Sequence, residues 1–433
     1  MNKRIKELYF SNKELTKEDY LKSQTKLILS GSTAGIINAL TVGTFFIGFL
    51  RYLGASPQYC AIISAVPQLG CILQLISPYI FERLRQRKLL ICICAFIFRF
   101  SVGTIIFVPF LFQGRKTVLT AIMMIYTLAF MVAGFVTPGL SNWYLTVAPK
   151  KGRGRFLAIK DIIAMLSVSA ISIVVSKLLD YYKVQGEIMI GFTIMFGISL
   201  IISVLDFVLI SLIDEPIMHQ ETTQDSFGKL IKRPLRDSKF RKIILFLSIW
   251  NFAIQFSVSF IPIFMLSTLG LGYSFISIIT VISNVVSMFS TYWWGRLADK
   301  TSWFLILRIS GMIIAVCYLG WTLVTEQNAR VLVPLIQILL ISSNGSFNMA
   351  SNNLQFDLAP TIGKTAYLGV TAAIACVISF LGALLGSAFS KAVQSVKINI
   401  VFHEIANLQI SFFITGALLA AAIFIMNFNR KVL

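Results

Sequence analysis

The segment NWYLTVAPKKGRGRFL, residues 142–157, returns in altered form as NLQFDLAPTIGKTAYL, residues 353–368. At one constant offset the two copies share five identities, which are Asn142/Asn353, Ala148/Ala359, Pro149/Pro360, Gly152/Gly363 and Leu157/Leu368. The pairs Arg153/Lys364 and Phe156/Tyr367 also keep their chemistry. Because the repeat distance is close to half the chain, we expect two similar halves joined in tandem.

The composition around the repeat is that of a membrane protein. Apolar residues make up 57% of the 433 residues, charged residues make up only 13%, and the mean hydropathy is +0.81. A soluble domain carries roughly 25% charged residues. The apolar residues fall in many runs of about 20 residues, the length that spans a bilayer as a helix. A helix satisfies its own backbone hydrogen bonds in lipid, so we predict an all-α polytopic membrane protein.

Twelve membrane-spanning helices are predicted, arranged as two six-helix bundles. The first six lie at about 27–50, 57–81, 89–112, 118–146, 156–179 and 187–212, and the second six at about 243–267, 274–296, 303–325, 331–356, 367–393 and 408–428. The chain is thereby divided into an N-terminal arm at 1–26, a bundle at 27–212, a linker at 213–242, a second bundle at 243–428 and a tail at 429–433.

The distribution of basic residues predicts the orientation in the membrane. The chain has 38 Lys and Arg against 18 Asp and Glu, and the basic residues gather in alternate segments between the apolar runs. The positive-inside rule places the arm, the linker, the tail and both copies of the repeat in the cytoplasm. The net charge of +20 therefore indicates membrane topology, and nucleic-acid binding is not expected. The arm lacks the apolar core and cleavage site of a signal peptide.

Few side chains are suited to metal, redox or hydrolytic chemistry. All six cysteines fall in apolar runs, and the only histidines, His219 and His403, lie in predicted loops. We expect no disulfide framework, no metal site and no cofactor. An intramembrane hydrolase would need a nucleophile–base pair, a metal cluster or paired midplane carboxylates, so an enzyme is not predicted.

A second, weaker repeat connects the sequence to a known family. PYIFER at 78–83 and GRLADK at 295–300 each place an acid before a base, in the predicted loops after the second and eighth spans. Twelve spans in a 6+6 division, the G-x-L-A-D-K string and P-x-x-x-R-G-R at 149–155 together resemble the major facilitator superfamily over nearly the whole chain. The first copy departs from the family pattern, with Pro78 in place of Gly and Glu82 in place of Asp.

The resemblance implies a transporter with two rocking halves and a central cavity lined by helices one, four, seven and ten. It also implies that loop charges hold the cytoplasmic helix ends together in one state. A carboxylate near a helix N-terminus is stabilised there by the helix dipole. The gating candidates are Glu82, Arg83, Arg153, Arg155, Gly295, Asp299 and Lys300. The alternative is that these charges only solubilise loops.

One basic residue lies deep within a predicted span. Arg99 is about eleven residues into helix three, or roughly 16 Å from its inner end. A charge at that depth requires an acidic partner, a wet cavity or an anionic substrate group. Asp161 or Asp206 could pair with Arg99, and direct contact with substrate is the other alternative. Only Asp161, Asp206 and Asp357 fall within predicted spans, all near the inner ends, which does not support proton coupling through a midplane carboxylate.

Uncharged polar residues favour the same four helices that line the cavity in the family. Asn251 and Gln255 are four residues apart, as are Asn344 and Asn348, so each pair shares a helix face. We expect the substrate contacts to be Asn38, Arg99, Asn251, Gln255, Asn344 and Asn348. The alternative for each amide is a hydrogen bond that joins helices.

The sequence therefore predicts a secondary active or facilitative transporter that moves a small, neutral or weakly anionic solute by alternating access. We expect a monomer in a cell membrane, in contact with lipid. Whether transport is coupled to an ion is left open. One alternative is a non-transporting receptor or sensor on the same scaffold. Another is a multidrug efflux pump, although helix five at 156–179 lacks the Gly-Pro run common in drug/proton antiporters.

Overall fold

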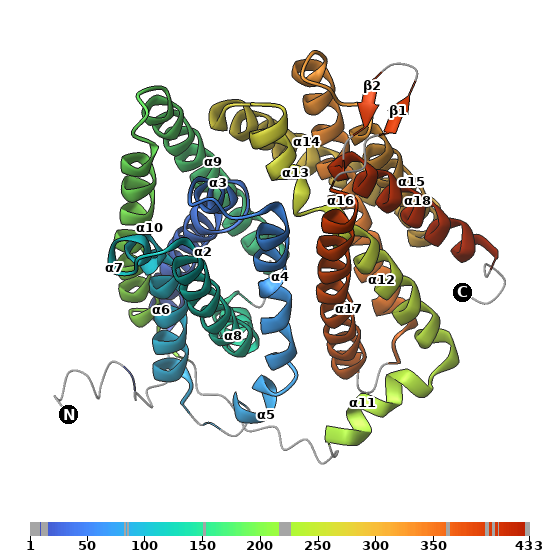
Figure 1. The fold of residues 1–433 in the computed structure, drawn as a ribbon. Helices are drawn as coiled ribbons and strands as arrows, with labels where there is room; N and C mark the ends of the chain where they lie inside the picture. Colours follow the sequence, from blue (N-terminus) through green and yellow to red (C-terminus); the bar gives the residue numbers. More distant parts are fainter. Residues whose placement is uncertain are drawn as a thin grey trace. The chain divides into compact units, whose positions relative to one another are not determined.

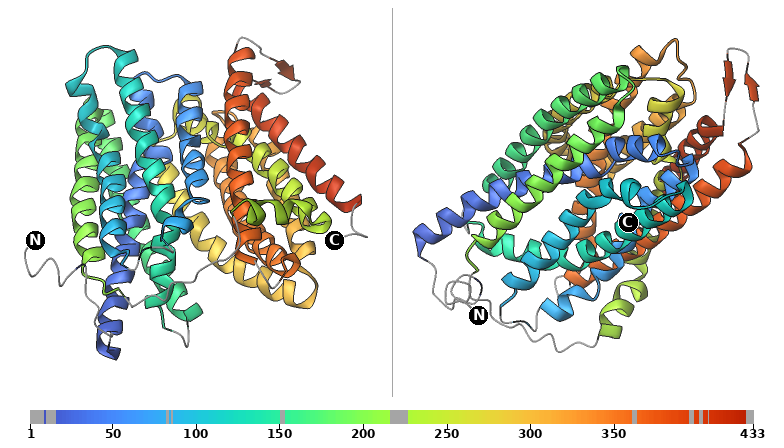
Figure 2. Two further views of the ribbon diagram at one scale, coloured as in Figure 1. Left: turned by 90° about the horizontal axis from the view of Figure 1, so that it is seen from below. Right: turned by 60° about the vertical axis from the view of Figure 1, so that its left-hand side comes forward.

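In the computed structural model, the described residues are 9, 16–81, 84, 86–149, 153–215, 227–360, 364–394, 398–400, 403–405 and 407–428. Nearly all of them are helical (Figures 1 and 2). By their packing they form two compact units. The first unit is Met1–Ala55 with Leu69–Gln224, and the second is Ser56–Gln68 with Asp225–Leu433. The division at 27–212 and 243–428 stays a prediction, and the grouping of Ser56–Gln68 with the second unit was not expected from the sequence.

The first unit is an all-helical bundle. Its elements are α2 (Lys17–Thr41), α3 (Thr44–Tyr52), the end of α4 (Pro57–Leu73), α5 (Ser77–Phe81), α6 (Lys88–Thr104), η1 (Ile105–Phe107), α7 (Val108–Leu111), α8 (Arg115–Val147), α9 (Arg153–Val184) and α10 (Ile188–Ser211). Within this unit α2 packs on α9 and α10, and α6 packs on α8 and α10.

The second unit repeats this packing. It holds the start of α4, α11 (Phe227–Arg236), α12 (Ser238–Ser257), α13 (Phe260–Ile263), η2 (Phe264–Thr268), α14 (Tyr273–Lys300), α15 (Trp303–Trp321), α16 (Ala329–Leu358), α17 (Lys364–Ala392) and α18 (Asn407–Phe428). The antiparallel strands β1 (Ile398–Ile400) and β2 (His403–Ile405) precede α18 (Figure 1). Here α12 packs on α17 and α18, and α15 packs on α16 and α18, so the neighbours of the first unit recur in order.

The helix count agrees with the sequence. Among the described residues, eleven helical stretches are long and apolar enough to cross a membrane, and Pro57–Leu73 is a shorter apolar helix. Breaks divide several spans, such as that between α12 and α13 just before Pro262, which is followed by the π-helical turn η2. A proline removes a backbone donor, which explains why the helix departs from regular α geometry there.

The opening repeat is duplicated in structure as well as in sequence. The helix α8 ends at Val147 and α16 ends at Leu358, while α9 begins at Arg153 and α17 begins at Lys364. The next residues, Ala148 and Ala359, are both extended, and each N–H donates to a carbonyl one turn back at 3.0 Å. Corresponding sequence positions therefore end and start corresponding helices.

Glycines permit close helix contacts in both units. In the first unit, Gly70 of α4 and Gly134 of α8 face each other so closely that a Cβ on either would overlap backbone atoms of the other helix. In the second unit, Gly382 and Gly386 of α17 lie against the backbone of Phe252 and Phe256 on α12. Gly382 and Gly386 are four residues apart, so both lie on the face of α17 that meets α12.

Three helix ends differ from the predicted spans and loops. The helix α2 starts at Lys17, within the predicted arm, because Thr16 and Asp19 form a capping box there. The linker at 213–242 contains α11, and α12 starts at Ser238, where Asp237 accepts hydrogen bonds from two backbone N–H groups. The GRLADK string is the end of α14 instead of a loop, because its residues after Gly295 sustain the helix as far as Lys300. The tail at 429–433 lies outside the described residues.

Candidate functional site: an uncharged pocket in the second unit

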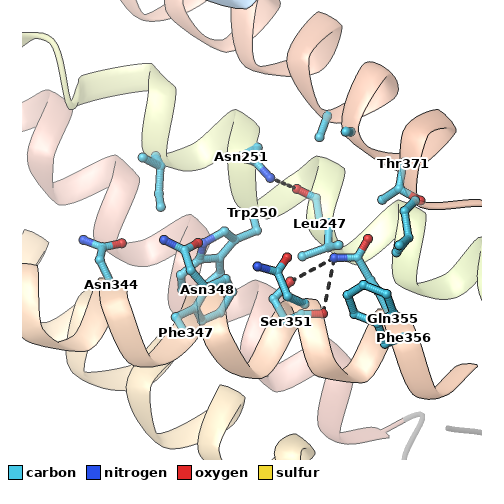
Figure 3. A pocket seen from close by; sticks show the side chains of 15 residues that line it. Leu247, Trp250, Asn251, Asn344, Phe347, Asn348, Ser351, Gln355, Phe356 and Thr371 are labelled. Atoms are coloured by element: carbon cyan, nitrogen blue, oxygen red, sulfur yellow. Dashed lines mark hydrogen bonds between the residues drawn. The ribbon is translucent and has the colours of Figure 1, made fainter. Parts of the chain in front are cut away.

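A pocket of about 380 Å³ opens between α12, α16 and α17 (Figure 3). Its polar lining consists of uncharged residues from these helices, which are Asn251, Asn344, Asn348, Ser351, Asn352, Gln355 and Thr371. The remaining lining residues are aliphatic or aromatic. A volume of this size is at the small end of the range for ligand pockets, so it suits a small solute.

Two aromatic rings form one wall of the pocket. Trp250 of α12 and Phe347 of α16 stack with ring centroids 4.1 Å apart and an angle of 15° between the ring planes. Both residues are only 2% exposed. Because the stack joins the two helices through fully packed rings, it fixes the separation of α12 and α16 at the pocket.

Helical spacing places the amides of α16 on one face. Asn344, Asn348 and Asn352 follow one another at intervals of four residues, and all three line the pocket. Asn348 and Asn352 are exposed, whereas Asn344 is half-buried. Consecutive amides on a helix are roughly 6 Å apart along its axis, so they can meet separate groups of one solute.

Several polar side chains of the pocket are oriented by the helix backbone. Asn251 Nδ2 donates to the carbonyl of Leu247 at 2.7 Å (Figure 3), and Asn344 Nδ2 donates to that of Leu340 at 3.0 Å. Gln355 Nε2 donates to the carbonyl and the hydroxyl of Ser351, at 3.2 and 3.4 Å. These bonds fix the side chains before any ligand arrives.

Three predicted substrate contacts come together here. Asn251, Asn344 and Asn348 all line the pocket, whereas Gln255, one turn further along α12, is half-buried and is not among the lining residues. Sequence reasoning missed the stacked rings as well as Ser351 and Thr371. The four-residue spacing that selected Asn344 and Asn348 also reaches Asn352, and the same reasoning could have found it.

The other two predicted contacts lie in the first unit. Asn38 is exposed on α2. Arg99 of α6 is 7% exposed and forms an ion pair with Asp206 of α10, which is 1% exposed. Asp206 Oδ1 also accepts hydrogen bonds from Ser30 and Thr33 of α2, at 3.0 and 2.6 Å. The predicted pairing of Arg99 is confirmed with Asp206, while its contact with substrate stays a prediction.

Asp161, the other predicted partner, is engaged elsewhere. Its carboxylate is 2.8 Å from Lys160 Nζ, and its side chain is largely exposed. Exposed pairs of this kind contribute little to stability. The choice between the two acids depended on which helix packs beside α6, and that helix is α10.

The predicted gating residues are dispersed. Glu82 and Arg83 lie outside the described residues. Arg153 and Arg155 are exposed in the first turn of α9, and Asp299 and Lys300 are exposed in the last turn of α14. Asp299 therefore lies at a helix C-terminus, and the argument from the dipole at a helix N-terminus is wrong for it. Gly295 is half-buried within the same helix.

A carboxylate at a helix N-terminus does occur in the first unit, at a residue that the sequence did not single out. Glu215 follows the end of α10, and its two oxygens accept the backbone N–H groups of Arg87 and Lys88 at the start of α6, at 2.8 and 3.2 Å. Burial raises the pKa of Glu215 above 4.5, and the two N–H bonds oppose that shift. This contact ties the N-terminus of α6 to the C-terminus of α10.

The comparisons with known proteins settle the family. Residues 27–387 match the sequence description of the Major Facilitator Superfamily. The chain belongs to this superfamily. It is therefore a multi-pass membrane protein of a transporter family. No curated protein matches the sequence.

Solved structures of superfamily transporters share the fold. The nucleoside transporter NupG is 15% identical with a TM-score of 0.68, and the match covers 95% of this chain and 99% of that one. The D-xylose-proton symporter is 15% identical with a TM-score of 0.69, covering 94% and 97%. A bacterial homologue of the human lysosomal transporter Spinster is 13% identical with a TM-score of 0.70, covering 97% and 98%. At these identities the likeness is one of fold.

Proposed function

We propose that this superfamily member moves a small, uncharged solute across a cell membrane by alternating access, with the pocket of the second unit as part of its binding site. The observation that carries the proposal is the pocket lining. Its amides, hydroxyls and stacked rings suit an uncharged polar solute. On binding, such a solute replaces its hydrogen bonds to water with hydrogen bonds to the amides and hydroxyls, at little net cost in free energy. The proteins of similar structure include a nucleoside transporter and a D-xylose-proton symporter, and nucleosides and xylose are small polar molecules.

Asn251, Asn344 and Asn348 are the proposed substrate contacts. Asn38, Arg99 and Gln255 are kept as predicted contacts, and the gating role of Glu82, Arg83, Arg153, Arg155, Gly295, Asp299 and Lys300 is kept with them. We also propose that both termini are cytoplasmic, that the protein acts as a monomer and that it catalyses no reaction.

Flux into proteoliposomes tests the proposal. A panel of labelled neutral metabolites is offered with no ion gradient, with a pH gradient and with a sodium gradient, which separates facilitated from coupled transport. We expect saturable uptake of at least one neutral solute. Saturable binding of a solute without flux would contradict transport and favour a receptor. Flux of several unrelated apolar cations would favour multidrug efflux.

A matched pair of variants connects flux with the pocket. Asn344→Leu removes a pocket amide that donates to a carbonyl one turn back, and Asn353→Leu removes an amide with the same local hydrogen bond, Nδ2 to the carbonyl of Met349 at 2.8 Å, outside the lining. Loss of flux in the first variant alone supports the site. Equal effects in both would show that the local hydrogen bond, not substrate contact, matters.

A further inference from the structure

The orientation of the amides in the pocket is fixed by chemistry. A backbone carbonyl oxygen only accepts hydrogen bonds, so the side-chain atom that meets it has to be the NH₂ group. The partners of Asn251 and Asn344 are the carbonyls of Leu247 and Leu340. The amide oxygens of Asn251 and Asn344 are therefore left for other partners, with both lone pairs and one spare N–H on each residue.

In two more polar residues, the donor group is also used in a hydrogen bond within the helix. Gln355 uses its NH₂ group on both the carbonyl and the hydroxyl of Ser351. The hydroxyl of Thr371, which is 3% exposed, donates to the carbonyl of Tyr367 at 2.9 Å. Each of these residues keeps an oxygen that can accept, and neither keeps a donor.

The remaining hydrogen-bonding capacity of the pocket is consequently biased toward acceptance. Four oxygens, on Asn251, Asn344, Gln355 and Thr371, offer two lone pairs each. The remaining donors are one spare N–H on each of the two asparagines and the O–H of Ser351, whose oxygen accepts from Gln355. The amides of Asn348 and Asn352 carry donors and acceptors in equal number and do not change the bias. No Lys, Arg or His is among the lining residues to attract an anion.

We infer that this pocket selects neutral solutes with several hydroxyl donors, and that it rejects their anionic counterparts. A hydroxyl-rich solute supplies the donors that the four oxygens lack. An anionic group would face partial negative charges in a site with no compensating cation, which is a repulsive element against that class of ligand. The inference rests on the proposed function, and it narrows the neutral or weakly anionic solutes expected from the sequence to neutral ones.

Three related probes test the inference with the purified full-length protein. They are a hexitol, the aldonic acid of the same carbon skeleton, and the fully O-methylated hexitol, each offered at millimolar concentration while thermal unfolding is followed. We expect the hexitol to raise the unfolding temperature and the other two to leave it unchanged. Equal or larger shifts with the acid or with the methyl ether would overturn the inference, as would no shift with the hexitol.

Variants assign the effect to the pocket. Thr371→Val keeps the side-chain shape and removes the accepting oxygen, and Asn344→Leu removes an amide oxygen. Each should weaken hexitol binding about tenfold, the effect of one lost hydrogen bond. The matched controls are Thr41→Val, whose hydroxyl donates to the carbonyl of Ile37 at 2.7 Å, and Asn353→Leu, both outside the lining. Equal weakening in variants and controls would contradict the assignment.

The two proposals can fail separately. Hexitol binding that depends on Thr371 without any flux would remove the transport function and keep the selectivity. Flux of an organic anion that is lost in Asn344→Leu would keep the transport function and overturn the selectivity.

Discussion

Arg99 and Asp206 form the most deeply buried ion pair in the described part of the chain. Their charges are stabilised by one another and by the hydroxyls of Ser30 and Thr33. Ser30 is in turn hydrogen-bonded to Tyr144 of α8 at 3.0 Å. Four helices of the first unit, α2, α6, α8 and α10, thus meet at one polar cluster in an apolar surrounding. Removing one partner of such a pair is costly because the other charge stays buried.

Asp206→Asn tests this pair by leaving Arg99 without a carboxylate. We expect the variant to lose about 3–5 kcal/mol of unfolding free energy, measured by denaturant unfolding in detergent. The double variant Arg99→Gln/Asp206→Asn, with no buried charge, should recover most of that loss. If the double variant also transports normally, Arg99 serves structure alone. If it is stable but inactive, contact of Arg99 with substrate gains support.

Glu215 provides a pH-dependent contribution to stability. Burial raises the pKa of this carboxyl in the folded protein above 4.5, its ordinary value. The folded state therefore binds the proton more tightly than the unfolded state, and this contribution is lost as the pH rises through the raised pKa. Relative to Glu215→Gln, the wild-type protein should become less stable as the pH increases above 4.5. The prediction would be contradicted if the unfolding free energy of the wild-type protein, relative to that of Glu215→Gln, stayed constant or increased with pH.

At the scale of the helices, the contact between α12 and α17 depends on residue size. Gly382 and Gly386 place the backbone of α17 against the carbonyls of Phe252 and Phe256. Transmembrane helices lack a hydrophobic driving force for association, so close backbone packing carries much of the contact energy. The same two helices also hold two walls of the pocket. Their separation thus controls the shape of the binding site.

Gly386→Ala should separate these helices. The added Cβ would overlap the carbonyl of Phe256, so we expect a loss of about 1–3 kcal/mol, the cost of overpacking. Gly369→Ala in the same helix is the control, because its Cβ would meet nothing within 4 Å. That substitution should be neutral or slightly stabilising, since alanine favours helix. The melting temperatures of the two variants are compared by thermal unfolding. Equal melting temperatures would contradict a contact that depends on the size of residue 386.

For the whole molecule, the constant offset of the repeat matches a repeated order of helix contacts. The most extensive contacts among α2, α6, α8, α9 and α10 of the first unit recur among α12, α15, α16, α17 and α18 of the second. The polar chemistry of the units differs nonetheless. The first contains the buried ion pair, whereas the second contains the uncharged pocket. Duplication therefore preserved the scaffold and left the interior free to diverge.

Topology is the testable property at this scale. The clustering of Lys and Arg predicts that both termini and the segment at 213–242 face the cytoplasm. Fluorescent-protein and alkaline-phosphatase fusions at the C-terminus should give a fluorescent and an inactive product, respectively. The matching fusions within residues 394–406, between α17 and α18, should show the opposite pattern. The reverse result at either position would contradict the predicted orientation of the chain in the membrane.

The sequence by itself determined the helices and their duplication. Runs of apolar residues have no stable form in lipid other than helices, and Pro149 and Pro360 end two of them at corresponding places. Spacing by four residues was sufficient to place Asn344 and Asn348 on one face of α16. Exact helix ends were less accessible, because Gly295–Lys300 has the composition of either a loop or a final helical turn.

Only the tertiary structure decided which faces meet. Arg99 of α6 pairs with Asp206 because α10, which carries Asp206, packs against α6. Asp161 lies on α9 and pairs with Lys160 instead. Likewise, Thr371 and the stack of Trp250 on Phe347 joined the asparagines only when α12, α16 and α17 packed together. The sequence sets the period of each helix, whereas the rotation of one helix against another follows from packing summed over many side chains.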